Sequence, residues 1–214
     1  MQKPPEQPRH LVYFADPMCS WCWGFAPVIN SLADHFGERL PVTLVVGGLR
    51  PGTTSVMSDE MKRDIREHWE MVAEQTGQPF DFSFFDRKGF IYDTEPAARA
   101  AVVARLLNPR LALVYLTSVQ RAFYAEGRDV TDGDVLADIA AEHGLDRREF
   151  KAAMATKEAG IATSQDFEAT RASGVSAFPT LYAGELESGY AMVTAGYRPL
   201  DGLADILEDW LAQP

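Results

Sequence analysis

The residues of this sequence best suited to chemistry are Cys19 and Cys22, the two cysteines among its 214 residues. A Cys-x-x-Cys spacing places the second sulfur one helical turn after the first, close enough for a disulfide between them. The pair follows the strand-like segment 11–14 and precedes an apolar pattern at helical spacing. Cys19 is therefore expected at a helix N-terminus, where free amide N–H groups and the helix dipole stabilise a thiolate. We interpret Cys19 as a nucleophile and Cys22 as its resolving thiol.

Two other interpretations of the cysteines are less consistent with their setting. Buried structural thiols do not need this spacing at a strand–helix junction. A structural zinc site needs two further ligands, and the chain has no third cysteine. The four histidines do not have the spacing of metal ligands: His10, His35, His68 and His143. We therefore expect neither a metal nor a cofactor.

The composition narrows the range of partners. The chain carries 31 Asp and Glu against 20 Lys and Arg, a net charge of −11, and has no basic cluster. This balance argues against nucleic acids and anionic membranes as partners. No apolar run approaches the ~20 residues of a membrane helix, and residues 1–10 lack the apolar core of a signal peptide. A single Cys-x-x-Cys without further cysteines suits a reducing compartment, so we expect a cytoplasmic protein.

The first half of the pattern predicts a β-α-β unit. Residues 1–9 read as a disordered lead-in, followed by a strand at 11–15 and a helix at 20–36 that contains Pro27. The strand at 41–46 follows a helix long enough to be a crossover, so the two strands should be parallel. The loop at 47–52 then leaves the carboxyl end of a strand, where open α/β sheets place their ligands.

The central part of the chain predicts helices throughout. Helical patterns cover Met61 to Val72, 97–107 and 110–125, and two short helices should start near Asp132 and Asp146. An aromatic loop at 80–85 interrupts them. Its aromatic side chains either pack in the core or form a rim around the thiols, and the best rim candidates are Phe84, Phe85 and Phe90.

The last part predicts a β-β-α unit. A helix at 161–173 leads to a strand at 175–182 that contains Pro179, and X-Pro bonds are those with appreciable cis population. A strand at 192–195 should pair with it antiparallel, because the connection is short. The helix at 200–211 should turn a stripe of five apolar residues to the core: Leu203, Ile206, Leu207, Trp210 and Leu211.

This order of elements, with a Cys-x-x-Cys after the first long strand and a proline near the third, resembles the thioredoxin fold. The helical block between the halves resembles the DsbA family, and the segment 16–25 (Asp-Pro-Met-Cys-Ser-Trp-Cys-Trp-Gly-Phe) is most similar to its cytosolic FrnE-like branch. The resemblance implies that Cys19 is the nucleophile, Cys22 the resolving cysteine and Pro179 the cis-proline beside them. Pro27 matches the proline that kinks the active-site helix.

The predicted fold class is accordingly α/β: a thioredoxin fold, with β-α-β and β-β-α halves, that carries an all-helical insertion. The thioredoxin-like domain is expected at 10–52 and 161–214, and the insertion at 53–160. The resemblance implies disulfide exchange with protein or peptide thiols, with glutathione as a further candidate partner.

The substrate is expected to lie extended beside the proline, against Ser20, Trp21, Phe178, Pro179 and Thr180. Ser20-Trp21 stands where strongly oxidising family members have Pro-His, and Phe178 replaces a residue that is often small or β-branched. Trp23 offers either a substrate contact or core packing.

Two alternative functions remain open at this stage. A glutathione-dependent isomerase or kappa-type glutathione transferase resembles the same architecture, but such proteins carry a serine in place of Cys19 and generally lack the second cysteine. The other alternative is a non-catalytic protein that binds peptides near Phe178. The sequence does not indicate an oligomeric state.

Overall fold

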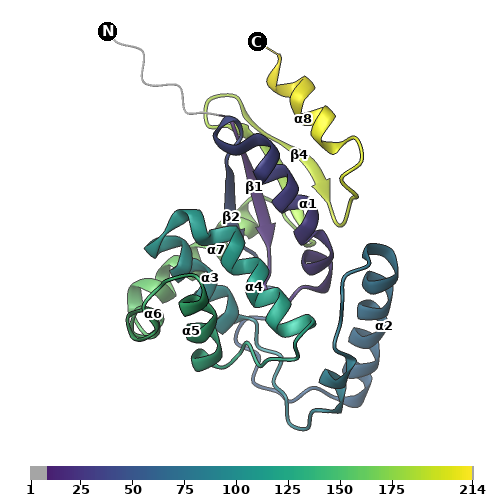
Figure 1. Ribbon diagram of the computed structural model, residues 1–214, viewed down its shortest axis with the longest axis vertical. Helices are drawn as coiled ribbons and strands as arrows, with labels where there is room; N and C mark the ends of the chain where they lie inside the picture. The colour runs from purple at the N-terminus through teal and green to yellow at the C-terminus, as the bar shows by residue number, and fades with distance from the viewer. Residues whose placement is uncertain (1–8, 214) are drawn as a thin grey trace.

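The computed structural model describes residues 9–213, and in them four strands form one mixed sheet in the order β2-β1-β3-β4. β2 (Val42–Val46) runs parallel to β1 (His10–Ala15), whereas β3 (Thr180–Glu185) is antiparallel to β1 and to β4 (Gly189–Ala195). The sheet therefore combines two strands from the N-terminal part of the chain with two from its C-terminal part (Figure 1). The predicted β-α-β and β-β-α pairings are thus confirmed, and the expected lead-in at 1–9 lies, except for Arg9, outside the described residues.

Helix α1 (Ser20–Phe36) makes the crossover from β1 to β2 and contains Pro27, as expected. The C-terminal helix α8 (Leu203–Leu211) lies beside the end of α1, and its Glu208 accepts hydrogen bonds from Arg39 at 2.7 Å and His35 at 2.9 Å. Leu203 and Leu207 are buried, but Ile206 is 47 % exposed, so its predicted core position was wrong. The reason is geometric: Ile206 lies about 100° around the helix from Leu207 and falls at the edge of the apolar stripe.

The segment between the two halves contains five α-helices: α2 (Asp59–Thr76), α3 (Glu95–Leu107), α4 (Ala112–Tyr124), α5 (Gly133–Glu142) and α6 (Arg147–Met154). Asp132 and Asp146 cap α5 and α6, as their sequence positions predicted. Helix α7 (Lys157–Ala172) begins four residues before its predicted start, because the Thr156 hydroxyl caps it by accepting from the Ala159 N–H at 3.1 Å. In residues 9–213 no helix has both the length and the apolar character that a membrane span requires.

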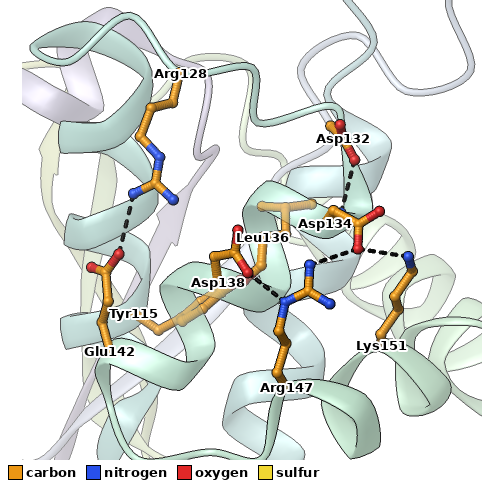
Figure 2. Close-up of polar contacts among 9 residues, drawn as sticks. All are labelled: Tyr115, Arg128, Asp132, Asp134, Leu136, Asp138, Glu142, Arg147 and Lys151. Atoms are coloured by element: carbon orange, nitrogen blue, oxygen red, sulfur yellow. Dashed lines mark hydrogen bonds and ion pairs between the residues drawn. The ribbon is translucent and has the colours of Figure 1, made fainter.

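Exposed ion pairs join the short helices α5 and α6. Figure 2 shows Arg147 of α6 between Asp134 and Asp138 of α5, with Lys151 reaching Asp134 at 2.7 Å. These donors hold the pKa of the Asp134 carboxyl below its usual range. All four side chains are about half exposed, so solvent weakens each pair.

An aromatic cluster attaches α2 to the other helices. The Trp69 ring is fully buried and lies 4.8 Å from that of Phe85, 5.1 Å from that of Phe84 and 5.0 Å from that of Tyr124. Phe84, Phe85 and Phe90 are each less than one-tenth exposed. Of the two roles considered for these rings, core packing is therefore confirmed and a rim around the thiols is wrong, since they form the core between α2 and α4.

Candidate functional site

Cys19 lies at the junction of β1 and α1, at the N-cap of the helix. Its backbone is extended, its N–H donates to the Asp16 carbonyl at 3.1 Å, and no side chain caps the helix. The first-turn N–H groups therefore remain free to favour negative charge near the sulfur. Cys19 is 7 % exposed, whereas Cys22 is fully buried.

The segment before β3 lies directly against this sulfur. The Cys19 thiol is 3.6 Å from the Phe178 carbonyl oxygen, and the Phe178–Pro179 peptide bond is cis. Pro179 itself is buried, and its carbonyl accepts from the Gly196 N–H at 2.7 Å. Two segments separated by about 160 positions thus meet at one thiol, as the sequence predicted.

The Phe178 side chain finds room because of a glycine in the loop after β2. A Cβ placed on Gly47 would lie 2.1 Å from the Phe178 ring, far inside any real contact distance. A Cβ on Gly48, with φ of +69°, would lie 2.8 Å from the ring of Phe167 of α7. The large residue before the proline is therefore accommodated by Gly47, about 130 positions earlier.

Cys22 is fully buried, one turn into α1. Burial raises the pKa of its thiol well above the usual value, and the hydrogen bond and charge of Cys19 add to that increase. The two cysteines are free thiols in this structure. At neutral pH Cys22 thus remains protonated, and Cys19 is the sulfur that another molecule can reach.

A buried carboxyl group, Asp16, organises the backbone around the thiols. Its Oδ1 accepts from the Met18 N–H at 2.9 Å, and its Oδ2 accepts from the Leu49 N–H at 2.7 Å. Burial raises the Asp16 pKa to about 6, against the lowering effect of these two bonds and a contact with Thr94. Through these hydrogen bonds Asp16 connects the turn after β1 with the loop after β2.

Cys19 lines a cavity of about 270 Å³, which we call the thiol cavity. Three of the expected substrate residues line it: Ser20, Trp21 and Phe178. Thr180 does not, since it is buried and its hydroxyl donates to the Ala177 carbonyl at 2.8 Å. Trp23 belongs to the core, where its ring stacks on Tyr124 and its Nε1–H donates to the Pro79 carbonyl at 3.1 Å.

The remaining walls of the thiol cavity come from the loop after β2, which the sequence analysis indicated, and from segments that it did not assign to the site. Helix α2 supplies Ile65, His68 and Trp69, and the loop after β2 supplies Leu49 and Arg50. Position after a parallel strand was the available signal for that loop. Tyr92 also lines the cavity, and its hydroxyl donates to the Met18 carbonyl at 2.8 Å. No sequence pattern marks Tyr92 or α2 as part of the site, because both reach it only through packing.

A mixed β2-β1-β3-β4 sheet with a Cys-x-x-Cys at the start of α1 and a cis-proline before β3 defines the thioredoxin class of protein. Residues 10–208 match the family described as the DSBA-like thioredoxin domain, and the chain belongs to that family.

Two solved structures and one curated relative are similar over most of the chain. A Nitrosomonas europaea protein provisionally assigned as a protein disulfide isomerase is 36 % identical, with a TM-score of 0.89, over 96 % of this chain and 98 % of its own. The cytosolic disulfide reductase DsbM from Pseudomonas aeruginosa is 27 % identical, with a TM-score of 0.79, over 94 % and 98 %. The ClpXP adapter protein SpxH of Bacillus subtilis is 27 % identical over 83 % of this chain, but the match spans only 58 % of that relative's length.

Proposed function

We propose that this protein is a thiol-disulfide oxidoreductase that exchanges disulfides with protein or peptide thiols through Cys19 and Cys22. The observation that carries the proposal is the unequal placement of the two sulfurs: Cys19 lines the thiol cavity, whereas Cys22 is fully buried behind it. A nucleophile must reach its substrate, and a resolving thiol needs to reach only its neighbour.

In the reducing direction, the Cys19 thiolate attacks a substrate disulfide, and one substrate sulfur leaves as a thiolate that takes a proton from water. Cys22 then loses its proton and attacks the Cys19 sulfur, which releases the second substrate thiolate and leaves a Cys19–Cys22 disulfide. Two electrons pass from the protein to the substrate. The reverse sequence oxidises a substrate dithiol, and the reduction potential relative to that of the compartment sets the direction.

We propose that the substrate lies extended along the segment before β3, where Ser176, Ala177 and Phe178 line the thiol cavity. Ser20 and Trp21 contact it from the first turn of α1. Pro179 fixes the conformation of this segment without lining the cavity. Thr180 supports it through the hydrogen bond from its hydroxyl to the Ala177 carbonyl and does not contact the substrate.

The similarity to DsbM, a cytosolic disulfide reductase, supports the reducing direction and a cytoplasmic location. A second DsbM structure, 28 % identical to this chain, contains glutathione. The segment 16–25 supports membership of the FrnE-like branch. We propose glutathione as one source of electrons. We also propose that residues 10–52 and 161–214 form the domain that carries the dithiol, and that residues 53–160 form the helical domain that covers it.

The test compares Cys19→Ser and Cys22→Ser with wild-type protein. Cys19→Ser should abolish reduction of insulin disulfides, because the remaining sulfur is buried. Cys22→Ser should accumulate a mixed disulfide between Cys19 and the substrate, detected by mass spectrometry, because nothing resolves it. Full insulin reduction by Cys19→Ser would contradict the proposal. Turnover of an electrophile with bound glutathione, with no dithiol chemistry, would favour the glutathione transferase or isomerase alternative instead.

A second candidate function, binding without catalysis, is favoured by the curated relatives that are named ClpXP adapter proteins. An adapter holds its partner through a surface and needs no electron transfer. The double variant Cys19→Ser/Cys22→Ser separates the two candidates: an adapter keeps its protein partner and biological effect in this variant, whereas an oxidoreductase loses the effect.

A further inference from the structure

The charge of the thiol cavity is opposite to that of the molecule. The chain has a net charge of −11, yet none of the described residues that line the cavity is Asp or Glu. Arg50 and His68 supply its basic groups. An acidic protein that keeps carboxylates out of one cavity and places a guanidinium there makes that cavity favourable for an anion.

Hydrogen bonds fix the backbone of Arg50, and its side-chain charge is not used in an ion pair within the described residues. Its N–H donates to the Thr94 hydroxyl at 3.0 Å, and its carbonyl accepts from the Thr94 N–H at 3.3 Å and from the Thr53 hydroxyl at 3.2 Å. The guanidinium lies 5.6 Å from the centre of the Tyr92 ring. No carboxylate among the described residues pairs with Arg50, whereas seven other arginines there have such a partner.

Two features connect this charge to the reactive sulfur. Tyr92, under the guanidinium, donates its hydroxyl proton to the carbonyl of Met18, the residue before Cys19. The N-terminal end of α1 also borders the cavity, since Ser20 and Trp21 of its first turn line it. An anion in the cavity therefore meets a fixed guanidinium and the positive end of a 17-residue helix beside Cys19.

We propose that the thiol cavity selects low-molecular-weight thiols and disulfides that carry a carboxylate, and that Arg50 is the residue that determines this specificity. The inference rests on the proposed function and names its small-molecule partner by chemical class. The partner's thiolate attacks Cys19 of the Cys19–Cys22 disulfide, and the Cys22 sulfur leaves and takes up a proton. A second thiolate of the same compound then attacks the mixed disulfide, which gives the compound's own disulfide and the Cys19 thiolate.

The experiment uses two reductants that differ only in charge: 3-mercaptopropionate and its amide, 3-mercaptopropionamide. Oxidised protein is mixed with each, quenched with iodoacetamide and analysed by mass spectrometry, and each rate constant is divided by the reagent's thiolate fraction. Wild-type protein should react about two- to fivefold faster with the carboxylate than with the amide, as one solvent-screened charge pair allows. The ratio should fall towards one as salt rises from about 0.05 to 0.5 M.

Arg50→Gln should bring this ratio to about one, because the carboxylate loses its partner while both reagents still attack as thiolates. Arg50→Lys keeps the charge and should retain a preference for the carboxylate. Arg63→Gln is the matched control, because Arg63 is an exposed cation of α2 that does not line the cavity, and its ratio should equal that of wild type.

A wild-type ratio of one, or a wild-type-like ratio in Arg50→Gln, would overturn the inference. So would an equal loss of rate with both reagents in Arg50→Gln, because that result indicates a purely structural residue. Wild-type protein that reacts with both reagents at equal rates would leave the proposed oxidoreductase function standing. If neither reagent nor dithiothreitol opens the disulfide, dithiol exchange itself fails and the inference falls with it.

Discussion

Asp16 is a fully buried acidic side chain beside the thiols, and its charge state affects both the fold and Cys22. Its two carboxylate oxygens hold the backbone N–H groups of Met18 and Leu49, so the group supports the site through hydrogen bonds. Burial nevertheless makes its ionised form costly, which is why its pKa rises to about 6. Its negative charge also helps to raise the pKa of Cys22.

The titration of Asp16 predicts a specific pH dependence of stability. A carboxyl group whose pKa is raised on folding stabilises the protein below its unfolded pKa, near 3.8, and this contribution is lost as the pH rises through about 6. The shift of about two units corresponds to on the order of 3 kcal/mol. The free energy of unfolding of wild type minus that of Asp16→Asn should therefore fall by about that amount between about pH 3.5 and 7.

Urea denaturation of both proteins at several pH values measures this difference. Other titrating groups, such as Glu208 with its pKa lowered to about 2 by Arg39 and His35, cancel in the subtraction. A difference that stays constant with pH would show that Asp16 has the same pKa in the folded and unfolded chain.

At the scale of elements, the site depends on how closely the loop after β2 approaches the segment before β3. Gly47 lies under the Phe178 ring with no space for a side chain. The Phe178 carbonyl in turn lies 3.6 Å from the Cys19 sulfur. A change in the loop after β2 should therefore move a group that contacts the reactive thiol, even though the loop carries no chemistry at this position.

Gly47→Ala should reduce the free energy of unfolding by about 1–3 kcal/mol, since its methyl group overlaps the Phe178 ring. In a Phe178→Ala background the same change should cost less than about 0.5 kcal/mol, because the overlap is gone. Chemical denaturation of the two single variants and the double variant completes the cycle. Equal costs in both backgrounds would mean that Phe178 is not what excludes a side chain at Gly47.

At the scale of the whole molecule, the helical segment is attached to the sheet through one ion pair that is largely shielded from solvent. Arg105 of α3 makes two bonds to Asp166 of α7, at 2.8 and 2.9 Å, and also donates to the Leu44 carbonyl. Asp166 accepts from the Val46 N–H at 2.9 Å. The two side chains are 22 % and 13 % exposed. Helices α3 and α7 are thereby fixed to β2, the strand whose following loop carries Arg50.

Arg105→Met should destabilise the protein by about 2 kcal/mol, because it leaves the Asp166 charge unpaired in a site with little water. Arg147→Met is the matched control. It removes more exposed ion pairs (Figure 2) and should cost less than about 1 kcal/mol. Urea midpoints at constant m-value measure both changes. A larger cost for Arg147→Met would contradict the assignment of the main polar connection to Arg105.

The sequence by itself determined the features that depend on neighbours along the chain. The spacing of Cys19 and Cys22, the helix that starts after them and the caps at Asp132 and Asp146 all follow from contacts within about one helical turn. The order of strands and helices also predicted the parallel pair β1–β2 and the antiparallel pair β3–β4, and the resemblance that this order carries implied that Pro179 lies beside the thiols.

Only the tertiary structure decided what surrounds the reactive sulfur. Arg50, Trp69 and Tyr92 reach the thiol cavity from segments between 31 and 73 positions after Cys19, whereas Phe84, with equally suitable chemistry, lies in the core. Tyr92 and Phe84 are aromatic residues eight positions apart, so residue type does not distinguish a cavity residue from a core residue. The choice depends on which side chains the packing of α2, α3 and α4 buries, and that packing is a sum of many weak contacts between distant segments.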